Sequence, residues 1–323
     1  MNVLELYSGI GGFHFALDES GVNGKVVASI EINNVANEIY KHNFPETKLY
    51  NSNIEGLTSE FINKLNVDTI LMSPPCQPFT RNGLQKDIKD PRTASFLHVL
   101  QLLPSLHITK LLIENVKGFE SSEMRDILTS TLEKCEFVYQ EFILSPHQIG
   151  IPNSRHRYYC LAKKLPHVFS FQAGKLMLTF PCQIQKQECF PISNILEDKV
   201  SQNYVLSDSI LMKRLNIMDI CHPDSTRSCC FTKAYGRFLE GTGSVFTEKT
   251  KSQFAEIIKE VNVSSDDRSK LELIKSLKLR FFTPREICRL MCFPERFTFP
   301  DTISDRKKYM VLETVLTLKW YQS

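Results

Sequence analysis

The first 165 residues alternate short runs of β-branched and aromatic residues with segments of helical periodicity, and this alternation limits the fold more than any other feature. It is typical of a mostly parallel sheet with helices on both faces. The predicted strands are Val3–Tyr7, Val26–Ile30, Thr69–Ser73, Lys110–Glu114 and Phe137–Leu144. The predicted helices are Gly12–Ser20, Asn33–Asn43, Ala94–Leu106 and Ser121–Cys135.

The pattern changes after residue 180, where a polar stretch begins and no clear alternation of strands and helices follows. We therefore predict an α/β protein with a doubly wound, mostly parallel sheet in residues 1–180 and a second, smaller domain in 181–278. Residues 279–323 are expected to return to the first domain. Within the second domain, residues 247–276 are rich in Lys, Glu, Ser and Asp with a weak helical pattern, which predicts a solvated helix or a mobile loop.

Composition excludes several classes of protein. No apolar run approaches the ~20 residues that span a bilayer, so no membrane association is expected. The N-terminus lacks the basic start and apolar stretch of a signal peptide, so we expect an intracellular protein with reduced cysteines. The ten cysteines include no C-x-x-C pair, which argues against a metal site. The net charge of +3, from 39 basic and 36 acidic residues, is too balanced to identify a nucleic-acid binder.

A glycine-rich turn, Leu6–Gly12, follows the first predicted strand directly and opens a helix. Glu31 stands about 20 residues further on, at the end of the next strand, where a carboxylate can accept hydrogen bonds from both hydroxyls of a ribose. The pattern indicates a nucleoside cofactor. The alternative is a tight turn without a ligand, and the run lacks the third glycine of a dinucleotide-binding motif.

Three further segments carry groups suited to chemistry. Cys76 follows two prolines at the end of a predicted strand, where open α/β sheets bind ligands and where the prolines hold the thiol in one place. Glu114 also ends a strand, and Arg155 and Arg157 lie in the segment Asn153–Arg157. Taken singly, these residues have plainer interpretations: a buried hydrophobic cysteine, a helix cap and surface charge. Their joint occurrence favours a site.

Pro-Cys, Glu-Asn-Val and Arg-x-Arg, in this order after a glycine-rich turn, resemble the cytosine-5 methyltransferase family over nearly the whole chain. The segments Cys229–Tyr235 and Gly241–Ser244 resemble the small-domain signature of its DNA-methyltransferase-like tRNA methyltransferases. Those relatives methylate a cytosine in the anticodon loop of aspartate tRNA. The resemblance implies a Rossmann-like, class I methyltransferase fold, with residues 181–278 as target-recognition domain.

The resemblance also implies the roles of the site residues. The Cys76 thiolate adds to C6 of cytosine, Glu114 engages the N3 and N4 edge as the protonated acid, and Arg155 and Arg157 bind O2 or a phosphate. S-adenosylmethionine is the cofactor, S-adenosylhomocysteine its product, and no metal is required. The residues implied to line the cofactor site are Tyr7, Ser8, Gly9, Ile10, Gly11, Gly12, Glu31, Asn53, Ile54 and Pro74. Asn53 departs from the acidic residue of many relatives.

The expected partner is tRNA, with DNA as a weaker partner. The expected protein is a monomer in the cytoplasm and nucleus. Residues 81–90 are expected to form a loop that is mobile without RNA and closes over it. Basic side chains of both domains are expected to converge on the cleft that contains Cys76.

The end of the chain departs from the family after Lys308–Leu312. Gly-Asn-Ser and Leu-Asn-Val are expected next, but the chain reads Glu313–Ser323. Back-translation in a frame shifted by one nucleotide permits the missing motif, so we hypothesise a frameshift. Three functions follow: an active tRNA methyltransferase, a DNA methyltransferase, or a catalytically impaired RNA-binding relative with a weakened cofactor pocket.

Overall fold

The computed structural model describes residues 1–79, 87–181 and 187–312. A seven-stranded sheet with the order β3-β2-β1-β4-β5-β7-β6 occupies the first half of the chain. All neighbouring strands are parallel except β7, which is antiparallel to both β5 and β6. The strands are β1 (Asn2–Leu6), β2 (Lys25–Glu31), β3 (Lys48–Asn51), β4 (Thr69–Met72), β5 (Lys110–Val116), β6 (Phe137–Leu144) and β7 (Arg157–Lys164).

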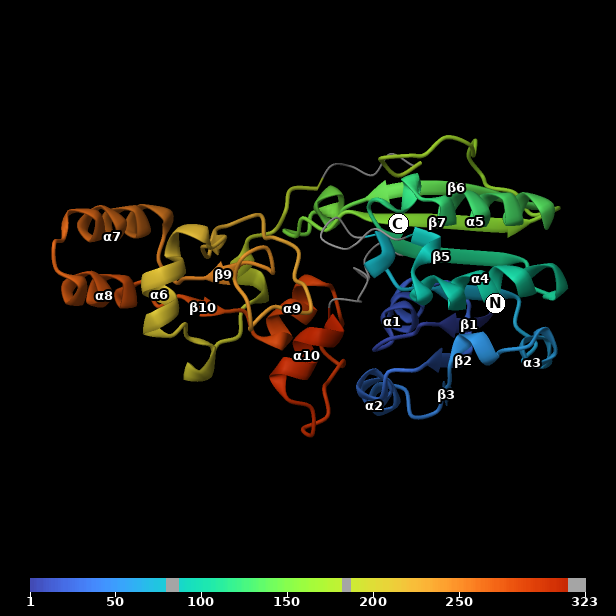
Figure 1. Cartoon of the computed structure of the whole chain (residues 1–323), viewed down its shortest axis with the longest axis horizontal. Helices are drawn as coiled ribbons and strands as arrows, with labels where there is room; N and C mark the ends of the chain where they lie inside the picture. Colours follow the sequence, from blue (N-terminus) through green and yellow to red (C-terminus); the bar gives the residue numbers. More distant parts are fainter. Residues whose placement is uncertain (80–86, 182–186, 313–323) are drawn as a thin grey trace.

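Helices cover both faces of this sheet, as the alternating pattern predicts (Figure 1). One buried cluster joins the sheet to α1 (Gly12–Glu19) and α2 (Asn34–Asn43). A second cluster, on the other face, joins it to α3 (Ser59–Lys64), α4 (Ala94–Leu102) and α5 (Glu123–Lys134). All four residues of β4 are buried, which is expected of a central strand covered on both faces.

The second half of the chain forms a smaller lobe with a three-stranded sheet in the order β10-β9-β8 (Figure 1). Its outer part has its own apolar cluster, whereas its inner part shares a cluster with α1, α2 and the large sheet. The elements are α6 (Asp208–Arg214), β8 (Ile220–Cys221), β9 (Val245–Phe246), α7 (Lys251–Val263), α8 (Asp267–Ser276), β10 (Arg280–Phe281), α9 (Pro284–Leu290) and α10 (Asp305–Leu312).

The five predicted strands and four predicted helices are all present, with ends shifted by a few residues. The structure adds β3, β7 and α3 to the first half. The polar stretch 247–276 forms the two exposed helices α7 and α8, and no residue of α7 is buried. None of the helices in the described part of the chain has the length and apolar composition needed to cross a bilayer.

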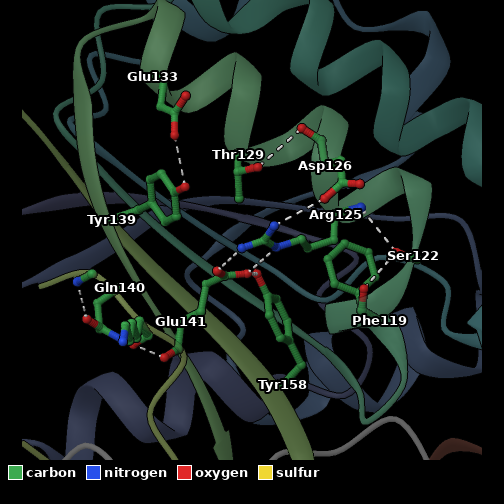
Figure 2. A network of polar contacts seen from close by, with 12 residues as sticks. Phe119, Ser122, Arg125, Asp126, Thr129, Glu133, Tyr139, Gln140, Glu141 and Tyr158 are labelled. Atoms are coloured by element: carbon green, nitrogen blue, oxygen red, sulfur yellow. Dashed lines mark hydrogen bonds and ion pairs between the residues drawn. The ribbon is translucent and has the colours of Figure 1, made fainter.

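An ion-pair network fixes β7 against α5 and β6 (Figure 2). Arg125 of α5 donates from Nε to Glu141 Oε1 of β6 at 2.7 Å and from Nη2 to the other carboxylate oxygen. The hydroxyl of Tyr158 donates to Glu141 Oε1 at 2.8 Å. Because Tyr158 follows Arg157 in β7, the network holds the strand that carries this arginine.

Candidate active site

A cavity of about 370 Å³ opens at the carboxyl edge of the large sheet, where β1, β2, β4 and β5 end. This volume lies within the range of small-molecule sites. Its predicted lining residues are Tyr7, Gly9, Glu31, Asn53, Ile54, Pro74, Cys76, Glu114, Arg155 and Arg157. Residues as far apart in the sequence as Tyr7 and Arg157 therefore meet at this edge of the sheet, where the parallel strands have their carboxyl ends.

Glu31 has its carboxylate fixed by backbone amides at one side of this cavity. Oε2 accepts from the Gly9 amide at 3.0 Å, and Oε1 accepts from the amides of Ile32 and Asn33 at 2.8 Å each. The acid is thus held in place with its lone pairs only partly used. The donor chemistry fits the ribose hydroxyls of the nucleoside cofactor that the resemblance implies.

The glycine-rich turn contributes mainly backbone to the site. Gly9 lines the cavity, whereas Ser8, Ile10, Gly11 and Gly12 are buried and are not among its described lining residues. Gly11 has a φ of +88°, and a Cβ at this position would lie 2.6 Å from the Phe44 ring. Gly11 is therefore required by the positive φ of the turn and by the close packing of the Phe44 ring.

The Pro-Pro-Cys segment is tied to the strands on either side of it. The Ser73 hydroxyl donates to the Tyr7 carbonyl at 3.3 Å, and the Asn115 amide donates to the Pro74 carbonyl at 3.4 Å. The Cys76 carbonyl accepts from the Phe79 amide at 3.0 Å, which starts a short 3₁₀ turn. These bonds hold the half-buried Cys76 thiol at the cavity wall.

Glu114 and Arg157 form an ion pair beside Cys76. The Nε of Arg157 lies 3.2 Å from Glu114 Oε1, and both side chains are nearly buried. The antiparallel pairing of β5 with β7 creates this contact, since Val116 lies opposite Arg157. Burial raises the pKa of Glu114, although Arg157 and Arg155 lower it in part. The carboxyl therefore holds its proton to a higher pH than an ordinary glutamate.

Arg157 also interacts electrostatically with Cys76. Burial by itself lowers the pKa of Arg157, but nearby anionic groups raise it above its ordinary value. In order of effect these groups are Cys230, Glu114 and Cys76. The attraction between Arg157 and a Cys76 thiolate favours the charged, nucleophilic form of the thiol.

Cys230 completes the site from the smaller lobe, and sequence reasoning had not assigned it a role. Its Sγ accepts from Arg155 Nη1 at 3.1 Å and from Arg157 Nη2 at 3.9 Å. Burial alone raises the pKa of Cys230, but the two guanidinium groups outweigh burial and lower it. The Cys230 thiol therefore loses its proton at a lower pH than an ordinary cysteine, and its sulfur is a hydrogen-bond partner of both arginines.

Several other residues line the cavity without having been predicted. Arg92 forms a bidentate pair with Asp90 and interacts electrostatically with Cys76. Ile32 follows Glu31 with 64% of its surface exposed, a suitable face for an aromatic base. The remaining unpredicted residues are Asn33, Ala36, Ser52, Glu55, Ser73, Pro75, Gln77, Ser95, Val116, Met310 and Val311.

Among the residues that the structure describes, the charged side chains that line the cavity are balanced rather than basic. Its lining includes three arginines and three glutamates, all from the first 160 residues: Arg92, Arg155, Arg157, Glu31, Glu55 and Glu114. The expected convergence of basic side chains from both lobes is not found in this lining. The smaller lobe places Lys233 and Arg237 just after Cys230 instead, and both are exposed.

Two expectations concern residues outside the described part of the chain. Of the expected mobile loop, residues 81–86 lie outside it; Asp87 is described and accepts from the backbone amides of Glu123 and Met124 at 2.7 and 3.2 Å. The altered segment 313–323 also lies outside it.

In the described ranges, no group of three or more His, Cys, Asp or Glu is arranged to hold a metal ion.

Comparison with known proteins identifies the family to which the chain belongs. The sequence profile of the C-5 cytosine-specific DNA methylases matches residues 1–311. A tRNA (cytosine(38)-C(5))-methyltransferase of Spodoptera frugiperda is 47% identical over 321 residues, covering 98% of this chain and 96% of that protein. A DNA (cytosine-5)-methyltransferase of Dictyostelium discoideum is 37% identical over 360 residues, covering 99% and 92%. A crystal structure of a Spodoptera frugiperda DNMT2 mutant superposes with a TM-score of 0.91 at 44% identity, covering 99% and 97%.

Proposed function

We propose that this chain, which belongs to the family of C-5 cytosine-specific DNA methylases, methylates C5 of cytosine 38 in the anticodon loop of a tRNA. The observation that carries the proposal is the meeting of Cys76 with the Glu114–Arg157 ion pair in one cavity. Family membership implies S-adenosylmethionine as methyl donor and S-adenosylhomocysteine as product. Glu31, Ile32 and the Gly9 backbone are suited to hold its nucleoside part, with Tyr7, Asn53, Ile54 and Pro74 around it.

Cys76 is proposed as the nucleophile. C5 of cytosine is a poor nucleophile, so the thiolate first adds to C6, and the ring then carries enamine character at C5. When bound, S-adenosylmethionine supplies the electrophilic methyl group. Loss of the C5 proton to a base, with release of the thiolate from C6, restores the aromatic ring. Arg157 and Arg92 favour the thiolate before it attacks.

Glu114 is proposed to hold the base during this attack. Addition of the thiolate to C6 drives negative charge into the ring toward N3, and a carboxylic acid at N3 neutralises it by donating its proton. Burial raises the pKa of Glu114 above its ordinary value, which favours the protonated acid that this step needs. Arg155 and Arg157 have planar guanidinium groups suited to the cytosine O2 or a flanking phosphate.

An RNA loop is the better substrate on physical grounds. The target ring must leave its stack before the Cys76 thiol can approach its face, and loop bases are already partly unstacked. The Spodoptera relative is named for cytosine 38 of tRNA, and aspartate tRNA is our proposal for the acceptor. We further propose a monomer that works in the cytoplasm and nucleus and binds DNA more weakly.

Transfer of labelled methyl groups from S-adenosylmethionine to unmodified tRNA tests this function. Unaltered chain and Cys76→Ala are compared on aspartate tRNA, on the same tRNA with uracil in place of cytosine 38, and on duplex DNA. We expect transfer only with the unaltered chain and the cytosine-bearing tRNA. Transfer to duplex DNA alone would replace the proposal with the DNA methyltransferase function, which the Dictyostelium relative favours.

The altered segment 313–323 is tested in the same assay. A version that ends with the family motif Gly-Asn-Ser, Leu-Asn-Val is compared with the present chain. Methyl transfer by the restored version alone would mark the present chain as an impaired RNA-binding relative. Equal rates would show that the altered segment is tolerated.

A further inference from the structure

One phenylalanine of the chain is exposed to solvent in the loop that follows Cys230. All 22 phenylalanines lie in the described ranges, and Phe238 is the only exposed one, with 55% of its surface accessible. The Arg237 guanidinium lies over its ring, 5.1 Å from the centroid. Lys233, in the same loop, is also exposed. A single exposed apolar residue is common on protein surfaces, but an aromatic ring with a guanidinium over it combines the two groups that bind bases and phosphates of single-stranded nucleic acid.

The loop that carries Phe238, residues 232–242, is built to hold it rigidly. The Thr232 amide donates to the Thr242 carbonyl at 2.9 Å, and the Thr242 hydroxyl donates back to the Phe238 carbonyl at 2.6 Å. Below them, the buried Tyr235 donates its hydroxyl to the Ser244 carbonyl at 2.6 Å and accepts from the Phe282 amide. The exposed ring therefore projects from a fixed base.

This loop borders the active-site cavity at two points. It begins just after Cys230, whose thiol contacts Arg155 in the cavity lining. Its Gly236 packs on the Tyr309 ring, since a Cβ there would lie 3.0 Å from the ring carbons. Met310, the next residue of α10, lines the cavity. The loop therefore lies next to residues of the cavity lining, and Phe238 is two residues from Gly236, the position that contacts α10.

We propose that Phe238, with Arg237 above its ring, is a stacking platform for a base next to the target cytosine; this rests on the proposed RNA substrate. Withdrawal of the target base into the cavity leaves its neighbours without a stacking partner, and an aromatic face can replace the lost one. Arg237 and Lys233 complement the phosphates on either side. The platform thereby stabilises the extruded state of the loop.

The test is a cycle of protein and RNA changes read by equilibrium binding. Phe238→Leu keeps apolar bulk and removes the ring, while Phe238→Tyr keeps the ring. Val263→Ala, at an 82% exposed residue of α7, is the control for loss of exposed apolar surface elsewhere. Each protein is titrated with a labelled anticodon stem-loop, intact or with one abasic nucleotide on either side of the cytosine. Thermal melting of each variant checks its folding.

We expect Phe238→Leu to raise the Kd for intact RNA about tenfold or more, the usual size of a base–aromatic contact, with Phe238→Tyr close to the unaltered chain. One abasic RNA should abolish the difference between Phe238→Leu and the unaltered chain. Binding by Phe238→Leu within about twofold of the unaltered chain on intact RNA would overturn the platform. If the unaltered chain still methylates the RNA in that case, only the platform fails; if it neither binds nor methylates RNA, the proposed function fails with it.

Discussion

Replacing Glu5 by Gln is expected to remove a loss of stability that the unaltered chain undergoes as the pH rises from about 6.5 to 8. Glu5 lies in β1 and is completely buried. Its Oε2 accepts from the Tyr40 hydroxyl at 2.9 Å, and this bond and the nearby backbone amides of His14 and Phe13 lower the pKa of Glu5 only in part. Burial raises the pKa of Glu5 from 4.5 to about 8. The folded protein therefore keeps a proton that the unfolded chain has lost at neutral pH.

The sign follows from proton linkage. Because the folded pKa is raised, the contribution of Glu5 to stability is complete below about pH 4.5 and is lost as the pH rises through about 8. Between about pH 6.5 and 8 this loss amounts to about 1.5 kcal/mol. The Nδ1 atom of His14 lies 2.8 Å from the Tyr40 hydroxyl in a hydrogen bond. Burial lowers the pKa of His14 to about 4. Because the folded pKa of His14 is lowered, the folded protein gains stability as the histidine of the unfolded chain loses its proton. Over the same pH interval this gain amounts to about 0.4 kcal/mol and offsets part of the loss from Glu5.

Urea unfolding of the unaltered chain and Glu5→Gln at both pH values measures the effect. Gln retains an acceptor for Tyr40 and cannot ionise, so all other titrating groups cancel in the comparison. The unaltered chain should lose stability relative to the variant by about 1.5 kcal/mol between the lower and the higher pH. Parallel pH profiles for the two proteins would refute the reasoning, because Glu5 would then titrate alike in both states.

Three further changes have defined outcomes. Arg125→Ala strands the buried Glu141 carboxylate and should lower the free energy of unfolding in urea by about 3 kcal/mol; a loss below about 1 kcal/mol would show that water already reaches the pair. Gly11→Ala places a side chain at a φ of +88° and against the Phe44 ring, so it should lower the free energy of unfolding by about 3 kcal/mol in the same assay. The control Gly21→Ala, where φ is +70° and no atom is near, should lower it by about 1 kcal/mol. Glu114→Gln should lower kcat about 100-fold or more with little change in RNA affinity, and an unchanged kcat would remove Glu114 from the mechanism.

The sequence predicted the catalytic edge of the sheet because strand and loop patterns are local. Cys76 and Glu114 each follow an apolar run, and parallel pairing of those runs brings their ends together. Two strands of the large sheet, β3 and β7, escaped prediction for identifiable reasons. β3 is a four-residue edge strand with exposed polar ends, and β7 begins at Arg157, the last residue of the arginine segment, whose charge obscured the strand.

Cys230 escaped assignment because its contacts depend on tertiary structure. It lies 75 residues after Arg155, and the signature segment that contains it does not show which groups its thiol contacts. The lobes meet through backbone bonds such as Ser154 to Ser228 at 3.0 Å, which no local pattern encodes. The burial of Ile10 and Gly12 away from the cavity was likewise not predictable, because a sequence motif does not show which of its residues face the ligand.

The central claim is that the Cys76 thiolate adds to C6 of the target cytosine. The most direct measurement is capture of that bond with an anticodon stem-loop carrying 5-fluorocytosine at position 38, since a fluorine on C5 cannot leave as the proton does. With S-adenosylmethionine present, the account predicts a denaturation-resistant protein–RNA adduct that mass spectrometry maps to Cys76 and that Cys76→Ala abolishes. A chain that methylates the ordinary RNA but forms no adduct, or forms it at Cys230, would contradict the account.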